Sequence, residues 1–88
     1  MQFDFDPAKD ALNRRKHGLS LGRARDFDWP AAVIELDNRR DYGERRFRAY
    51  ANMDGRLHMA AFTLRNGVTR IISLRRANKR EVKRYGRP

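Results

Sequence analysis

Two dipeptides that favour tight hairpin turns, Asp54-Gly55 and Asn66-Gly67, divide the second half of this chain into three segments. Asp, Asn and Gly tolerate the positive φ angles that the commonest two-residue hairpin turns require. Arg46–Met53 alternates apolar and polar side chains, whereas Leu57–Leu64 is apolar on both sides, as a central strand is. With Val68–Leu74 as the third strand, the sequence predicts an antiparallel meander.

The first residues predict a short strand followed by a helix. Phe3 and Phe5 alternate with polar residues, as in a strand with one apolar side. Asp6 is a good helix cap and Pro7 suits the first helical position. Gly18 is a typical residue for the end of that helix.

A second short helix and a further strand are expected before the meander. Ser20 is a candidate cap for a helix that reaches Phe27, and Pro30 is expected to end it. Ala32–Leu36 is predicted as a strand, and the polar segment after it as a loop.

The chain ends in a predicted basic helix, Lys79–Tyr85. Asn78 and Glu81 have the spacing of a capping box, in which each residue binds the backbone N–H of the other. The predicted order is therefore β-α-α-β-β-β-β-α. This order indicates one domain over residues 1–88, an α+β fold with a small antiparallel sheet packed against helices.

Positive charge is concentrated in the second half of the sequence. Residues 1–44 hold 8 Lys and Arg against 9 Asp and Glu, whereas residues 45–88 hold 13 against 2, so the halves carry −1 and +11 of the total of +10. A fold does not require this asymmetry, and a polyanionic partner such as RNA or DNA would explain it. A solvated, soluble surface is the alternative interpretation.

Composition also excludes or disfavours several classes of site. The chain has no cysteine, which excludes disulfides and thiolate metal sites, and its two histidines, His17 and His58, lack zinc-ligand spacing. We expect no metal and no cofactor. No apolar run approaches the length of a membrane span, and the acidic N-terminus is unlike a signal peptide, so a cytoplasmic protein is expected.

Arg75 and Arg76 form the first candidate site. They fall where the last predicted strand gives way to the helix, and two arginines there could converge on one phosphate with Arg70 in support. The alternative is that both arginines only solvate a loop.

Lys9, Asn13 and Lys16 lie along one stripe of the first predicted helix, and His17 follows at its end. A histidine there could act as a general acid or base near neutral pH. A capping or surface histidine is the alternative interpretation, and His58 is expected to pack in the sheet.

Glu44 opens the predicted strand that contains Arg46, and it could accept a proton or orient an arginine. An exposed charge pair of little energetic value is the alternative. Tyr42, Tyr50 and Tyr85 could stack on RNA bases. Further contacts to RNA are expected from Lys16, Arg45, Lys79, Arg80 and Tyr85.

Three segments together resemble the BrnT family of bacterial toxins: residues 3–9, residues 13–20 with Lys16-His17-Gly18, and residues 70–81 with Ile71-Ile72-Ser73. Glu44-Arg45 and Tyr85 extend the resemblance over nearly the whole chain. Gly22 and Arg23 depart from it, because the family usually has acidic residues after Ser20.

The resemblance implies a fold similar to RelE-type toxins and a ribonuclease of a type II toxin–antitoxin system that halts translation by cutting RNA. It also implies a BrnA-like antitoxin with a ribbon-helix-helix domain, in a hetero-oligomer that we expect to be a heterotetramer. In such systems the complex binds operator DNA through the antitoxin.

We hypothesise a metal-independent cleavage in which the RNA 2′-hydroxyl attacks the phosphodiester. Arg75, Arg76 and Arg70 would hold the phosphate, His17 or Glu44 would transfer the proton, and Lys9 would offset developing negative charge. A non-catalytic RNA- or DNA-binding domain is the alternative function, and a module that only docks an acidic antitoxin is a third. RNA cleavage in EDTA separates the enzyme from both.

Overall fold

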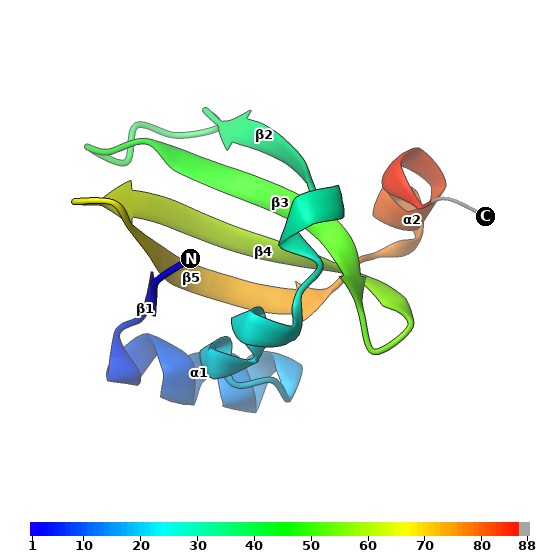
Figure 1. The fold of residues 1–88 in the computed structure, drawn as a ribbon, viewed down its shortest axis with the longest axis horizontal. Coiled ribbons are helices and arrows are strands. Elements are labelled where there is room, and N and C mark those ends of the chain that lie inside the picture. Colours follow the sequence, from blue (N-terminus) through cyan, green and yellow to red (C-terminus); the bar gives the residue numbers. More distant parts are fainter. Residues whose placement is uncertain (87–88) are drawn as a thin grey trace.

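The computed structural model describes residues 1–86, which form one mixed five-stranded sheet with helices around it (Figure 1). The strand order is β1-β5-β4-β3-β2. The elements in chain order are β1 (Phe3–Asp4), α1 (Pro7–His17), the 3₁₀ helices η1 (Leu21–Asp26) and η2 (Trp29–Ala31), β2 (Val33–Asp37), β3 (Arg46–Met53), β4 (Arg56–Arg65), β5 (Val68–Arg76) and α2 (Lys79–Tyr85).

The predicted meander and its turns are confirmed. Asp54 and Gly55 have φ of 55° and 75°, and Asn66 and Gly67 have φ of 51° and 78°, so both turns use the left-handed region. Positive φ at both central residues matches the twist of antiparallel strands. β4 lies at the centre of the sheet, which explains its apolar residues on both sides.

The expectation of a purely antiparallel sheet is wrong. β1 pairs in parallel with β5, with Phe3 opposite Thr69 and Asp4 opposite Arg70. Turn signals specify only the pairing of strands that are neighbours in sequence. β1 and β5 are far apart in sequence, and they pair because α1, which follows β1, packs against β5.

β5 is longer than predicted, and this changes the position of two candidate residues. The strand continues to Arg76, with Arg75 opposite Met59 and Arg76 opposite His58. The two arginines are therefore the last two residues of the strand, just before the cap of α2 at Asn78, and they keep the alternating directions of strand residues. A register shift between Ala61 and Phe62 precedes them, and such a bulge has no signal in the sequence.

Helix α1 begins and ends as predicted, because the Asp6 side chain accepts a hydrogen bond from the Ala8 N–H and Gly18 has φ of 71°. The segment that follows is corrected to two 3₁₀ helices, and Pro30 lies inside the second of them. Ser20 does cap η1 through the Gly22 N–H. The carboxylate of Asp10 accepts the Leu21 N–H at 2.7 Å and so binds a second free donor of that turn.

The hydrophobic core lies between the sheet and the layer of α1 and η1. Leu21 of η1 and Leu74 of β5 are fully buried, and Trp29 packs edge-on against Phe62 and donates its indole N–H to Ala24 O at 2.8 Å. His58 is buried and bound to the Arg56 carbonyl, which confirms its structural role.

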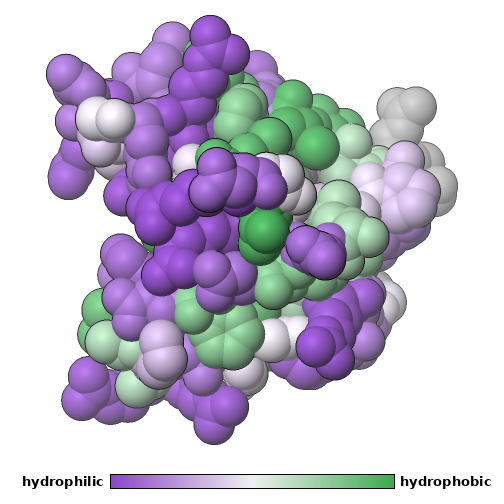
Figure 2. All heavy atoms as spheres, turned by 60° about the vertical axis from the view of Figure 1, so that its left-hand side comes forward, coloured by the Kyte–Doolittle hydropathy of each residue, from purple (hydrophilic) through white to green (hydrophobic). Residues whose placement is uncertain are grey.

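The surface that Figure 2 shows is largely hydrophilic, with apolar residues reaching it in places. Among the exposed apolar residues are Ile34 and Leu36, which are half exposed on β2 at the edge of the sheet. The helical layer thus covers the core face mainly at β3, β4 and β5 and leaves β2 partly uncovered. The opposite face of the sheet carries mainly polar side chains.

Candidate nucleic-acid interface

The face of the sheet opposite α1 and η1, here called the open face, carries a row of cationic and aromatic side chains. Successive residues of a strand point to opposite sides, so Arg46, Arg48 and Tyr50 share the open face while Ala49 and Ala51 enter the core. Tyr50 lies opposite Met59, and Met59 lies opposite Arg75 of β5. The strand register therefore places Arg75 two strands away from Tyr50, on the same face.

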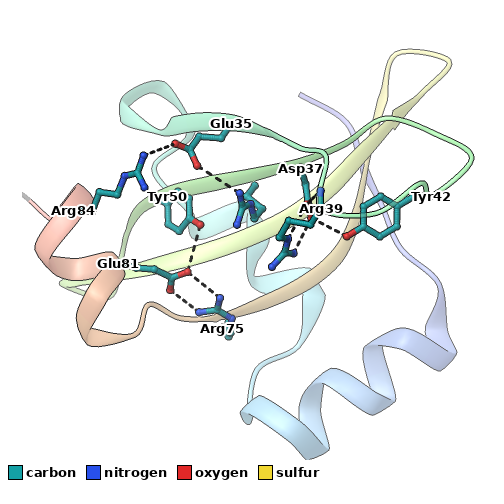
Figure 3. A network of polar contacts seen from close by, with 9 residues as sticks. Glu35, Asp37, Arg39, Tyr42, Tyr50, Arg75, Glu81 and Arg84 are labelled. Atoms are coloured by element: carbon teal, nitrogen blue, oxygen red, sulfur yellow. Dashed lines mark hydrogen bonds and ion pairs between the residues drawn. The ribbon is translucent and has the colours of Figure 1, made fainter.

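Helix α2 closes one end of this face and holds Arg75 through a paired contact (Figure 3). The two terminal nitrogens of Arg75 donate to the two carboxylate oxygens of Glu81, at 2.7 and 3.0 Å. The Tyr50 hydroxyl donates to the same carboxylate at 3.4 Å. The hydrogen bond from Arg75 lowers the pKa of Glu81, and the carboxylate in turn raises the pKa of Arg75, so both groups stay charged and the guanidinium is held in one orientation.

The edge strand β2 supplies the acidic side of the open face. Glu35 lies 3.8 Å from Arg48 and 3.9 Å from Arg84 of α2. Asp37 is buried, and Arg39 donates to both of its carboxylate oxygens at 2.8 and 2.9 Å. These contacts lower the pKa of Asp37. The charge of Arg39 makes a small opposing contribution to the pKa of Arg75, which the contact with Glu81 keeps raised. Figure 3 shows Arg39, Tyr50 and Arg75 on one side of the sheet.

Arg48, like Arg46 on the same face, has hydrogen-bonding capacity that the described part of the chain does not use. Its Nε is buried and has no hydrogen-bond partner within residues 1–86, and its nearest carboxylate lies at a distance longer than a hydrogen bond. Buried polar atoms are normally paired. A cavity of about 200 Å³ opens beside it, lined by Arg48, Tyr50, Glu81 and Arg84 among others. An added anion there would find several donors.

The two central candidates, Arg75 and Arg76, do not converge. They are adjacent in β5, and Arg76 lines a different cavity with Arg56 and Val82. The expectation that both grip one phosphate is therefore wrong for this arrangement, because they occupy one strand and not a loop. Arg70 lies at the other end of β5, where it forms an ion pair with Asp4 at 2.6 Å.

Among the candidates on α1, His17 is the one whose pKa is affected by the charge of Arg75. His17, in the last turn, is partly buried, and burial lowers its pKa, with smaller contributions from the charges of Lys16 and Arg75. The imidazole is therefore neutral at neutral pH. Lys16 is exposed. Lys9 is also exposed, and it lies about 12 Å from His17 toward the N-terminal end of the helix, at about 1.5 Å per residue.

Asn13 does not belong to an exposed stripe with the two lysines. It is buried, and its side chain bonds the backbone of Leu74. The short strand β1 pairs with only the first part of β5. Helix α1 covers the remaining edge of β5, and this places Asn13 beside that edge.

Glu44 lies at the end of β3 that is remote from α2. Arg65 donates to it at 3.0 Å and Arg46 lies at 3.5 Å, and these contacts lower its pKa. It is thus a carboxylate held by two arginines and separated from Arg75 by the length of the strand. Arg45 beside it is exposed, and its carbonyl accepts from the Thr63 hydroxyl.

The remaining candidates lie on α2, and the helix itself is confirmed. Asn78 and Glu81 form both hydrogen bonds of the capping box. Lys79 and Arg80 are exposed on its first turn, and Arg80 lines the cavity beside Arg48. The ring of Tyr85 stacks on Tyr50, with centroids 4.0 Å apart.

Sequence reasoning missed Arg39 and Arg48 as members of this interface. Arg48 could have been found, because its spacing of two residues from both Arg46 and Tyr50 places all three on one side of a strand. Arg39 follows β2 in a polar loop, and no pattern in the sequence indicates that it folds back toward Arg75.

Residues 1–86 contain neither a cluster of metal ligands nor a membrane-spanning helix. No group of three or more His, Cys, Asp and Glu side chains is placed to hold a metal ion. No helix in this part of the chain is long and apolar enough to cross a membrane.

Comparison with known families identifies a family for most of the chain. A family model described as the ribonuclease toxin BrnT of a type II toxin–antitoxin system matches residues 5–81. A comparison with curated proteins gave no match. The matched segment begins at the residue after β1, ends within α2 and includes most of the open face. The chain therefore belongs to the BrnT family of ribonuclease toxins from type II toxin–antitoxin systems.

Proposed function

We propose that this protein is the toxin of its system, a metal-independent endoribonuclease that binds RNA on the open face of its sheet and inhibits translation in the cytoplasm. The observation that carries the proposal is the position of Arg75, held by Glu81 among Arg39, Arg48 and Tyr50. A fixed guanidinium is suited to bind a phosphate and to stabilise the charge that develops on it. RelE-like architecture is part of the same proposal.

RNA supplies its own nucleophile in this reaction, which is why a metal is not required. The 2′-hydroxyl oxygen attacks phosphorus while the bond to the 5′ oxygen breaks, leaving a 2′,3′-cyclic phosphate and a 5′-hydroxyl. The neutral imidazole of His17 lies at the end of α1, which packs along the edge of β5, and from that edge it is proposed to accept the 2′-hydroxyl proton. The departing oxygen takes a proton from solvent. Arg75 binds the non-bridging oxygens, and Glu81 is its positioning residue.

The other candidates are proposed to act outside this centre. Lys16, Lys79 and Arg80 are exposed around it and would contact flanking phosphates. Glu44 and Arg70 are each paired at the far end of the sheet. Lys9, Arg45 and Arg76 are exposed, and we assign them to the general attraction of RNA and not to the chemistry.

The decisive experiment compares Arg75→Ala with Arg76→Ala, since these neighbours lie on opposite sides of one strand. Purified proteins are incubated with labelled RNA in excess EDTA under single-turnover conditions. Arg75→Ala is expected to slow cleavage by about a hundredfold to a thousandfold, and Arg76→Ala by less than about threefold. Circular dichroism confirms that both variants fold.

Intact RNA with the wild-type protein in EDTA would contradict metal-independent cleavage. If RNA then stays intact with added Mg²⁺ as well, a binding function would replace catalysis. Equal effects of Arg75→Ala and Arg76→Ala would contradict the assignment of the centre to the open face.

The family implies an antitoxin partner, and we propose a BrnA-like ribbon-helix-helix protein that forms a heterotetramer and carries the complex to operator DNA. A net charge of +10 favours an acidic, partly disordered segment as the neutralising element. Co-expression with the adjacent reading frame should restore growth and yield a complex whose mass is measurable by light scattering. A monomeric toxin that stays active in the presence of that protein would contradict this assignment.

A further inference from the structure

A second and larger cavity lies directly beside the small one on the open face. Its volume is about 350 Å³. Tyr50, Tyr85 and Arg84 line both cavities, so these three side chains connect them. A chain that enters one cavity can therefore continue into the other past the same aromatic pair.

The two cavities differ in the chemistry of their other walls. The smaller one adds Arg48 and Arg80 together with the carboxylates of Glu35 and Glu81 and the amide of Asn78. With the shared Arg84, its walls therefore hold three cations and two carboxylates. The larger one adds the apolar side chains of Ala31, Val33 and Leu57, together with the amide of Asn52. Charge on one side and apolar walls on the other match the phosphate and the base of a single nucleotide.

Tyr85 presents the accessible ring of this aromatic pair, because Tyr50 stacked against it is buried. The rings of Tyr50 and Tyr85 stack at an interplanar angle of 12°, and the guanidinium carbon of Arg84 lies 5.4 Å from the centre of the Tyr85 ring. Planar aromatic and guanidinium groups stack on bases of any sequence. Stacking here would add affinity without selecting a base.

Selection needs a polar group, and Asn52 is the residue placed to supply it. It follows Tyr50 by two residues on β3, so both side chains lie on the open face. It is exposed, and its side chain makes no hydrogen bond within residues 1–86. A carboxamide offers one donor group and one acceptor, which can pair with the edge of a base.

We propose that the larger cavity is a nucleobase subsite for the nucleotide next to the cleaved phosphate, and that Asn52 determines which base is preferred. The inference rests on the proposed RNA cleavage and deepens it, because the family assignment gives no sequence preference. The occupant is a base of RNA, and insertion of a side chain from the antitoxin is the competing outcome.

The first test measures cleavage of an RNA pool randomised at the positions around one site. The wild-type protein is expected to prefer one base by about fivefold to 150-fold at a single position, the range for one good pair of hydrogen bonds. Asn52→Ala should remove that preference, and Asn52→Asp, which replaces the donor by an acceptor, should shift it to another base. Val33→Trp should fill the cavity and abolish the preference, whereas Leu64→Trp, on an exposed strand end elsewhere, should not.

The second test detects the base without using catalysis. Nucleoside 5′-monophosphates are titrated into the protein, and methyl resonances of Ala31, Val33 and Leu57 are followed by NMR. Ring-current shifts that saturate and are lost in Val33→Trp support the subsite. Shifts in a protein that cleaves no RNA would sustain the subsite and overturn only the proposed enzymatic function.

Two results overturn the inference itself. One is cleavage with an unchanged base preference in Asn52→Ala and Val33→Trp. The other is loss of antitoxin binding in Val33→Trp with base preference and nucleotide shifts unchanged, which would make the cavity a protein-docking site.

Discussion

At the scale of single residues, the side chain of Asn13 takes the place of a neighbouring strand at the edge of β5. β1 covers only the first part of that edge. Beyond it, the Leu74 N–H donates to Asn13 Oδ1 at 3.2 Å, and Asn13 Nδ2 donates to the carbonyls of Leu74 and Leu19 at 2.9 and 2.8 Å. One amide thus satisfies three buried or partly buried backbone groups and fixes α1 against the strand that carries Arg75.

Replacing Asn13 by Ala should therefore lower the free energy of unfolding by about 2–4 kcal/mol, because buried backbone groups lose their partners. Lys9→Ala, exposed on the same helix, should change it by less than about 0.5 kcal/mol. Urea denaturation monitored by circular dichroism measures both. A loss below about 1 kcal/mol for Asn13→Ala would show that water replaces the amide at little cost.

The pKa of His17 provides a second residue-scale prediction. Burial and the charges of Lys16 and Arg75 hold it below the ordinary value of 6.5, so the folded protein favours the neutral ring. Stability from this group is present above the unfolded pKa and is lost as pH falls through the lower folded pKa. NMR titration should give a pKa below 6.5 that rises in Lys16→Gln and, less, in Arg75→Gln.

The same titration bears on catalysis. If His17 accepts the proton, the acid limb of the cleavage profile should follow its measured pKa and move upward in Lys16→Gln. A limb that stays fixed while the His17 resonance shifts would remove the histidine from the mechanism.

At the scale of elements, α2 depends on its cap and on contacts with the sheet. A helix as short as Lys79–Tyr85 is not stable alone. Asn78→Ala removes the side-chain acceptor of the Glu81 N–H and should destabilise α2 by about 1 kcal/mol. Hydrogen exchange should show faster exchange in residues 81–85 with protection in β4 unchanged. Lys79→Ala is the matched control, and equal exchange in the two variants would contradict the role of the cap.

Elements set by local signals were predictable from the sequence. Asp54-Gly55 and Asn66-Gly67 specify hairpins because their residues adopt positive φ, and Asn78 with Glu81 specifies a helix start because both hydrogen bonds are local. The parallel pairing of Phe3 with Thr69 was not predictable, since it depends on how α1 packs.

The candidate site was predictable only in part for the same reason. Arg75 was identified by its residue type and by the strand before it. Arg75 and Arg76 point to opposite sides because the pairing of β5 with β4 continues through both residues. The position of Arg39 near Arg75 depends on the conformation of the loop after β2. Glu81 was assigned to a cap, and its second contact with Arg75 requires the angle between β5 and α2.

At the scale of the whole molecule, the excess charge is distributed over both sides of the sheet and not over one continuous patch. Arg48 and Arg75 occupy the open face, whereas Arg76 lines a cavity with Arg56, and Arg25 is exposed on η1 in the helical layer. Charge alone therefore does not locate the RNA, because every arginine contributes to long-range attraction. Direct contact with phosphate differs from such attraction in releasing counterions.

The salt dependence of binding should consequently identify the RNA-binding face. The logarithm of the association constant for a 2′-O-methyl RNA, which lacks the nucleophile, should fall linearly with the logarithm of salt concentration. Loss of one phosphate contact reduces the slope by about 0.7 for a single strand, so Arg75→Ala and Arg48→Ala should each show that reduction. Arg25→Ala removes an equal charge from the helical layer and should leave the slope unchanged. Fluorescence anisotropy between 50 and 300 mM KCl gives the slopes. An equal reduction in all three variants would mean that RNA binds the molecule without preference for a face, and it would contradict the assignment of the open face as the RNA-binding surface.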